Sequence, residues 1–101
     1  MSAFLANDDA AYAAATVAYT GTAGSTSTFP PGANAVLVFC TTAAYVKVGV
    51  GITATTASTP LPANTPIIMR VPPGSGAPWR VSAIQIASGG NVYAKPGNIV
   101  D

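Results

Sequence analysis

The sequence predicts an all-β fold in a single domain, and two observations carry that prediction. From residue 35 onward, short runs alternate between valine and other residues, as at Tyr45-Val46-Lys47-Val48, and such alternation is typical of strands that bury one face. Proline and glycine interrupt the chain at short intervals, with 9 prolines and 10 glycines in 101 residues. Short strands separated by such turns predict a small β-sandwich or barrel.

Residues 1–28 are expected to form an N-terminal arm or linker ahead of a β-sandwich domain over residues 29–101. This first segment is rich in Ala, Thr, Gly and Ser, and two structures fit it. One is a short helix from about residue 9 to residue 15, with acidic caps and a run of alanines. The other, which we favour, is an extended arm with a strand near residues 16–20, because so short a helix is marginal alone and Gly/Ser/Thr-rich sequence follows.

Two strands are predicted at residues 35–41 and 44–50. The first is apolar at every position up to Cys40, as a strand buried on both faces would be. In the second, three valines share one face, while Tyr45, Lys47 and Gly49 share the other. The short connection near residues 42–43 predicts that the two strands form a hairpin.

The remaining elements follow the same logic. Residues 53–65 are expected to be a loop or an edge strand, because Pro60 and Pro62 cannot sit in a central strand. A strand at 67–71 ends at the Pro/Gly-rich corner 72–76. A second hairpin is predicted from 79–87 and 91–95, turning at Ser88-Gly89-Gly90, with Pro96-Gly97 closing the sheet. The resulting fold is a jelly-roll-like β-sandwich or barrel with an extended N-terminal arm.

The composition points to a surface built for contact. Half of the residues are hydrophobic and only 7% are charged, whereas a typical globular domain has about 25% charged residues. Small neutral side chains must therefore form much of the exterior, which favours assembly with other proteins.

Charge and hydropathy exclude several classes of partner. The net charge is +1, and the basic residues lie far apart, which argues against nucleic acid and anionic lipid as partners; they are Lys47, Arg70, Arg80 and Lys95. No apolar run approaches the roughly 20 residues of a membrane span, and Asp8-Asp9 stand where a signal peptide would be apolar. We expect the chain to be cytosolic in the cell that makes it.

Residues suited to catalysis are scarce. The chain has no histidine and no glutamate, and its carboxylates are Asp8, Asp9 and Asp101 at the two ends. General acid-base chemistry, metal binding and phosphate binding all need groups that this pattern lacks. We therefore expect a protein that is not an enzyme, with no catalytic, cofactor-binding or metal-binding residue and no cofactor. The single cysteine, Cys40, is expected to be a buried small hydrophobe and not a reactive thiol.

The aromatic residues leave one binding function open. Tyr45, Trp79 and Tyr93 could form a sugar-binding face if they lay on the same side of the sheet. The competing interpretation places Trp79 in the core or in an interface, with the tyrosines half-buried.

The rhythm of strands and corners over residues 33–95 resembles that of small accessory proteins of tailed-bacteriophage particles, namely capsid decoration or cement proteins and related head-tail β-modules. The segments that carry the likeness are Val36-Leu37-Val38-Phe39, Ala44-Tyr45-Val46-Lys47-Val48-Gly49, Pro60-Leu61-Pro62-Ala63 with Pro66, Val71-Pro72-Pro73-Gly74 and Gly89-Gly90-Asn91-Val92-Tyr93.

This resemblance implies a structural virion protein that binds and stabilises an assembled capsid. Its partners would be further copies of itself, with a homotrimer expected, and the major capsid protein or another virion protein. Its location would be the virion, assembled in the host cytoplasm, and residues 2–24 would reach neighbouring subunits as an arm. The alternative is a glycan- or host-binding β-module at a head or tail tip.

Overall fold

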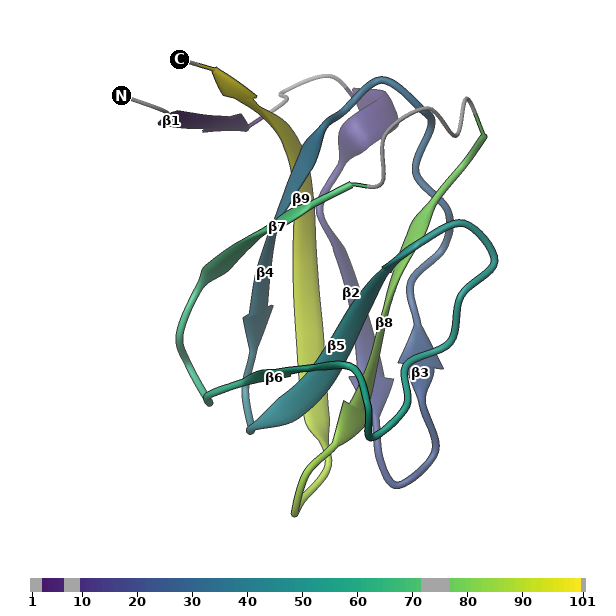
Figure 1. Cartoon of the computed structure of the whole chain (residues 1–101), viewed down its shortest axis with the longest axis vertical. Coiled ribbons are helices and arrows are strands. Elements are labelled where there is room, and N and C mark those ends of the chain that lie inside the picture. Colours follow the sequence, from purple (N-terminus) through teal and green to yellow (C-terminus); the bar gives the residue numbers. More distant parts are fainter. Residues whose placement is uncertain (1–2, 7–9, 72–76, 101) are drawn as a thin grey trace.

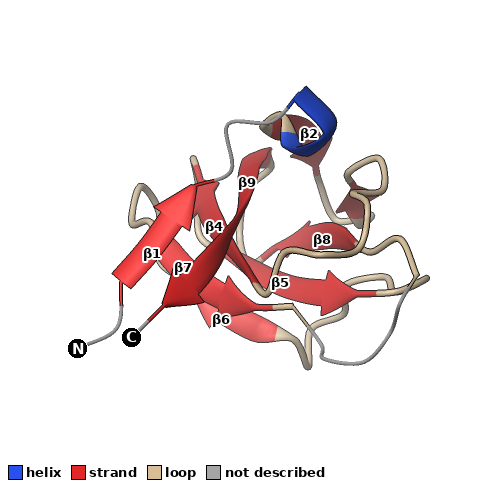
Figure 2. Ribbon diagram, turned by 90° about the horizontal axis from the view of Figure 1, so that it is seen from above, coloured by secondary structure: helices blue, strands red, loops and turns tan. Residues whose placement is uncertain are grey.

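The computed structural model describes residues 3–6, 10–71 and 77–100 of the chain. These residues form nine β-strands and one 3₁₀ turn, η1 (Ala10–Tyr12). The strands make two antiparallel sheets that face each other (Figures 1 and 2). The all-β sandwich predicted from the sequence is therefore confirmed. Within these ranges, no helix has the length and apolar character that crossing a membrane requires.

The first sheet, called here the β9 sheet, is centred on a long C-terminal strand. On one side of β9, β2 pairs with its first half and β1 with its last residues, while β4 pairs along the other side and β7 lies outside β4. Its strands are β1 (Ala3–Ala6), β2 (Ala15–Tyr19), β4 (Ala35–Cys40), β7 (Ile67–Arg70) and β9 (Gly90–Val100).

The second sheet, called here the β8 sheet, has the strand order β3-β8-β5-β6. Its strands are β3 (Gly24–Ser25), β5 (Ala44–Gly49), β6 (Thr59–Leu61) and β8 (Arg80–Gln85). The edge strand β6 contains Pro60, so the expectation of a loop or an edge over residues 53–65 is confirmed.

The pairing of the strands is that of a jelly roll. The antiparallel pairs β2·β9, β3·β8, β4·β7 and β5·β6 describe one long hairpin that turns between β5 and β6. The pairs β4·β9 and β5·β8 then close this rolled hairpin into two sheets. An eight-stranded double sheet of this kind has few exposed edges for its size.

Both predicted hairpins are wrong, although the strands lie where the sequence placed them. β4 and β5 belong to different sheets, and so do β8 and β9. Each of these strands has an apolar face rich in valine or alanine, and those faces can bury one another only across the sandwich. The connection between β4 and β5 is held by the buried residue Tyr19, whose hydroxyl donates to the carbonyl oxygen of Thr42 at 2.7 Å.

Pro96 and Gly97 do not end the last strand, as the sequence suggested, because β9 continues to Val100. Thr41 N–H donates to Asn91 O, and Ile99 exchanges two hydrogen bonds with the Asn34 side chain. Odd-numbered residues of β9 therefore direct their backbone groups toward β4, and Pro96 faces the opposite edge. On that edge, pairing with β2 stops at Ala94 and pairing with β1 starts at Gly97. No described strand therefore pairs with Pro96 there, and its missing N–H costs the sheet no hydrogen bond.

The expected arm over residues 1–28 is partly built into the sandwich. Residues 15–19 and 24–25 are β2 and β3, and the strand expected near residues 16–20 is confirmed. Of the alternative helix over residues 9–15, the described residues form only the turn η1 at Ala10–Tyr12, and Ala15 already belongs to β2. Residues 1–2 and 7–9 of the arm lie outside the described residues, as does the corner predicted at 72–76.

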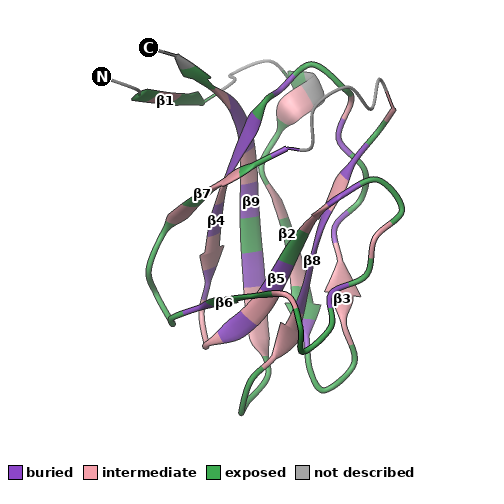
Figure 3. Cartoon of the chain, viewed as in Figure 1, coloured by how far each residue is buried: buried purple, intermediate pink, exposed green. Residues whose placement is uncertain are grey.

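The core lies between the sheets and is built from small and β-branched side chains around one large ring. Trp79 is 1% exposed and packs on Phe29, with ring centroids 4.8 Å apart. Cys40 is buried as predicted. Figure 3 shows buried and exposed bands alternating along β9, the pattern of a strand with one face in the core.

Candidate functional site

The two outer faces of the sandwich differ in how they are covered. The outer face of the β8 sheet carries residues 50–58, the connection between β5 and β6, which fold back across it. Gly51 turns this segment with a φ of +62°, a conformation that favours glycine. Arg80 Nε donates to the Ile52 carbonyl oxygen at 2.9 Å, and Ala54, in the middle of the segment, is buried. Part of this face is therefore closed by the chain itself.

Ser82 is the point where the covering segment is fixed. Its hydroxyl accepts the Ala54 backbone N–H at 2.9 Å and the Ser25 hydroxyl at 3.0 Å, and it donates to the Gly24 carbonyl oxygen at 3.2 Å. One donor and two acceptor positions are all that a serine hydroxyl offers, so Ser82 is fully satisfied although completely buried.

The outer face of the β9 sheet is open and largely apolar. Phe39 and Tyr93 are directly paired across β4 and β9, with ring centroids 5.7 Å apart. Leu37 lies in the next row, between Ile68 of β7 and Lys95 of β9. Tyr93 is 41% exposed and Ile68 46% exposed. We call this surface the open face and define it by Leu37, Phe39, Ile68, Arg70, Tyr93 and Lys95.

The open face also explains why the sequence of β4 is apolar throughout. Its inner residues Val36, Val38 and Cys40 are fully buried, as expected of a core strand. Its outer residues Leu37 and Phe39 are partly exposed, so the prediction of burial on both faces is wrong for the isolated chain. Apolar side chains left on the outside of a sheet are the kind of surface that a partner covers.

Two basic residues, Arg70 and Lys95, belong to the open face. Asp8, Asp9 and Asp101 fall outside the described residues. Lys95 directs its ammonium group to the Tyr12 carbonyl oxygen at 3.0 Å, while Arg70 is exposed at the end of β7. The open face therefore has an apolar centre with Arg70 at its margin.

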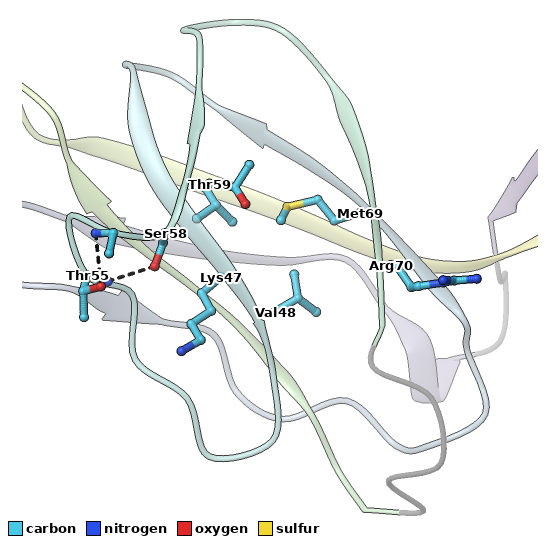
Figure 4. Close-up of a pocket in the computed structure, with 9 residues that line it drawn as sticks. Lys47, Val48, Thr55, Ser58, Thr59, Met69 and Arg70 are labelled. Carbon is cyan, nitrogen blue, oxygen red and sulfur yellow. Dashed lines mark hydrogen bonds between the residues drawn. The ribbon is translucent and has the colours of Figure 1, made fainter.

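A pocket of about 350 Å³ opens beside the edges of β5 and β7. Hydroxyls of Thr55, Ser58 and Thr59 share its wall with the side chains of Val48 and Met69. Lys47 and Arg70 also line it, but Figure 4 shows their head groups pointing away from each other. Among the described residues of the lining, no carboxylate, imidazole or thiol accompanies these hydroxyls. Nor do the described ranges bring together three or more side chains of the kinds that hold metal ions.

The three aromatic residues considered for sugar binding do not share a surface. Trp79 is in the core, as the competing interpretation expects, although Tyr93 is exposed and not half-buried. The indole N–H of Trp79 has no hydrogen-bond partner among the described residues. Tyr45 pairs with Ile84 on the outside of the β8 sheet, whereas Tyr93 lies on the open face, on the other side of the sandwich. A binding face that uses all three is therefore not formed.

The environment of Cys40 makes its thiol unreactive. Burial raises the pKa of the Cys40 thiol above its usual value, and the neighbouring Tyr19 hydroxyl opposes this shift only in part. At neutral pH the sulfur remains a protonated, small apolar group.

Sequence reasoning missed Ser82 and the open face. A serine between valine and alanine in β8 carries no local signal that a distant segment will bury it. For the open face, the signal in the sequence is the run of apolar residues in β4, which by itself predicts burial on both faces of the strand. In comparisons with known proteins, no protein-family model, no curated protein and no solved structure matches this chain.

Proposed function

We propose that this protein is a structural component that works by contact, binding an assembled protein shell through its open face in the manner of a capsid decoration protein. The observation that supports this most is the contrast between the two sides of the sandwich. One outer face is partly covered by residues 50–58, whereas the other leaves Tyr93 and Ile68 in solvent.

The apolar centre of the open face favours a protein partner. Contiguous apolar surface on a soluble domain is typical of interaction sites, and aromatic residues are enriched at the buried centres of protein interfaces. The pair Phe39 and Tyr93 provides flat aromatic area that is held by the sheet, so little side-chain entropy is lost when it is covered.

The charge pattern defines the partner further. Arg70 is exposed at the end of β7, at the margin of the open face. A partner surface with an apolar centre and carboxylates at its rim would complement it, and such rim pairs steer association and orientation more than they add affinity.

A repetitive shell would suit contacts of this limited size, because identical weak contacts gain strength when several are made at once. The jelly-roll strand order occurs in viral capsid domains and also in lectins, so the fold alone does not choose between them. The resemblance over residues 33–95 and the separation of the three aromatic residues favour the shell. In this proposal the protein resides in the virion, self-associates as a homo-oligomer, expected to be a trimer, and catalyses no reaction.

The test is co-sedimentation with virus particles isolated from the cells that make this chain. We expect the wild-type protein to pellet with the particles and the Ile68→Lys variant to remain in the supernatant, because it places a charge in the apolar contact. Val50→Lys is the matched control, since Val50 is also 46% exposed but belongs to the connection between β5 and β6, outside the open face. Both substitutions are at exposed positions, so both variants should fold, which circular dichroism checks.

Two results would contradict the proposal. The first is a wild-type protein that never pellets with particles. The second is equal loss of binding in Ile68→Lys and Val50→Lys, since that would show an effect of added charge with no role for the open face.

A further inference from the structure

The strand β1 exposes an edge that the fold leaves without a partner. β1 and the last residues of β9 extend together from one corner of the molecule (Figure 1). The other side of β1 pairs with no described strand. Leu5, at 57%, is the most exposed of the large hydrophobic residues in the described ranges.

The register of the sheet fixes which backbone groups of β1 are free. The odd-numbered residues Asn91 and Ile99 of β9 form their backbone hydrogen bonds on the β4 side. Because this direction alternates along a strand, the even-numbered residues of β9 direct their N–H and C=O groups toward β1. Leu5 lies opposite Asn98, so the backbone of Leu5 faces β9. The N–H and C=O groups of Phe4 and Ala6 therefore point away from β9, along the free edge.

The other edges of the two sheets carry features that discourage pairing with another chain. β6 contains Pro60, β7 ends in Arg70, and β3 has only two residues. At the edge of β2, the chain at Gly24 lies against the Ala18 carbonyl oxygen. Proline, charge, shortness and covering chain are the ways in which proteins protect strand edges. β1, with the sequence Ala-Phe-Leu-Ala, has no charge and no proline.

We propose that β1 pairs antiparallel with β1 of a second copy, across a two-fold axis beside Leu5, so that the two β9 sheets become continuous. In this register Phe4 and Ala6 of each copy exchange backbone hydrogen bonds with Ala6 and Phe4 of the other. The free groups of the edge are then satisfied in two reciprocal pairs. A two-fold contact of this kind closes on itself, so it gives a dimer where the resemblance implies a trimer.

The side chains of β1 favour a second copy as the occupant. In a two-fold antiparallel pair, the residue at the axis faces itself, and a charged residue there would be repelled by its own copy. Leu5 instead meets Leu5 in an apolar contact, and the large ring of Phe4 stands opposite the small Ala6. Phe4 and Ile99 are paired on the side of the sheet that continues into the open face, so the pairing would join the apolar surfaces of two copies.

Disulfide trapping of Leu5→Cys tests this register. Residues facing each other in a non-hydrogen-bonded antiparallel pair have Cα atoms about 4.5 Å apart, within the range that a disulfide spans. We expect the variant to form a covalent dimer under mild oxidation, at least ten times faster than Ile68→Cys, a similarly exposed control on the opposite edge of the sheet. Wild-type protein should not cross-link, because Cys40 is buried.

A second variant separates strand pairing from chance collision. Adding Ala6→Pro to Leu5→Cys removes an N–H that faces only the free edge, so pairing of β1 with β9 is retained and cross-linking should fall at least fivefold. The proposal is overturned if Leu5→Cys and Ile68→Cys cross-link at the same rate, or if Ala6→Pro leaves the rate unchanged. Neither result would contradict the proposal that the open face binds a shell, because co-sedimentation of the Ile68→Lys and Val50→Lys variants tests that proposal separately.

Discussion

The hydroxyl of Ser82 accepts the backbone N–H of Ala54 at 2.9 Å, and this bond ties residues 50–58 to the outside of the β8 sheet. Both residues are buried. The contact joins positions 28 residues apart in the sequence, and it closes one outer face of the sandwich while the other stays open.

Replacing Ser82 with alanine should destabilise the protein by about 1–3 kcal/mol, because the buried Ala54 N–H and the Gly24 carbonyl oxygen lose their partner. Urea unfolding followed by circular dichroism measures the change. The control is Ser58→Ala in the same segment, where the hydroxyl accepts an exposed N–H from Thr55. That variant should stay within about 0.5 kcal/mol of wild type, and equal costs for the two would contradict the role assigned to Ser82.

Strand positions could be predicted from the sequence because the signals for them are local. β4, β5 and β7 begin and end within one or two residues of the expected bounds, since alternation and Pro/Gly interruptions act over a few residues. Pairing could not be predicted in the same way. A connection of three residues after Cys40 suits a hairpin as well as a crossing between sheets, and the choice depends on which distant valines and alanines cover the inner face.

The candidate surface was harder still to predict. The apolar run of β4 showed that both faces of the strand are suited to burial, but whether Leu37 and Phe39 meet a second layer depends on how the whole chain is arranged. The contact of Ser82 with Ala54 has no local pattern at all. Long-range contacts of this kind are fixed by the closing of the jelly roll, which no short window of sequence contains.

Trp79→Ala should cost about 3–5 kcal/mol, because it removes the largest buried side chain and its contact with Phe29. Trp79→Phe should cost less than half as much, since the ring contact is kept and a buried N–H with no partner among the described residues is removed. Chemical unfolding followed by circular dichroism gives both values. The placement of Trp79 in the core is contradicted if Trp79→Ala is as stable as wild type. It is also contradicted if the tryptophan emission of the wild-type protein does not shift to the red on unfolding, because that result indicates an exposed ring.

Cys40 should make stability fall at alkaline pH. Because burial raises the pKa of the folded thiol, its contribution is fully present below the unfolded pKa of about 8.5. That contribution is lost as the pH rises from there through the folded pKa, since the unfolded chain ionises first. The measurement is the unfolding free energy of wild type minus that of Cys40→Ala at pH 7 and above pH 9. The difference should shrink at the higher pH, and a constant or growing difference would exclude a raised thiol pKa.

Gly97 should be required for β1 to lie on β9. A Cβ atom at this position would meet the Leu5 carbonyl oxygen and the Phe4 ring, and close approach of another backbone is a common reason for glycine inside a strand. Gly97→Ala should therefore displace β1, and the Leu5 amide should lose its protection in hydrogen exchange. The sandwich should lose only about 1 kcal/mol, because Leu5 is largely exposed and Phe4 only partly buried. Gly21→Ala is the control, since its Cβ would meet nothing closer than Gln85 at 3.7 Å. If the Leu5 amide in Gly97→Ala stays as protected as in this control, β1 does not depend on the space that Gly97 leaves.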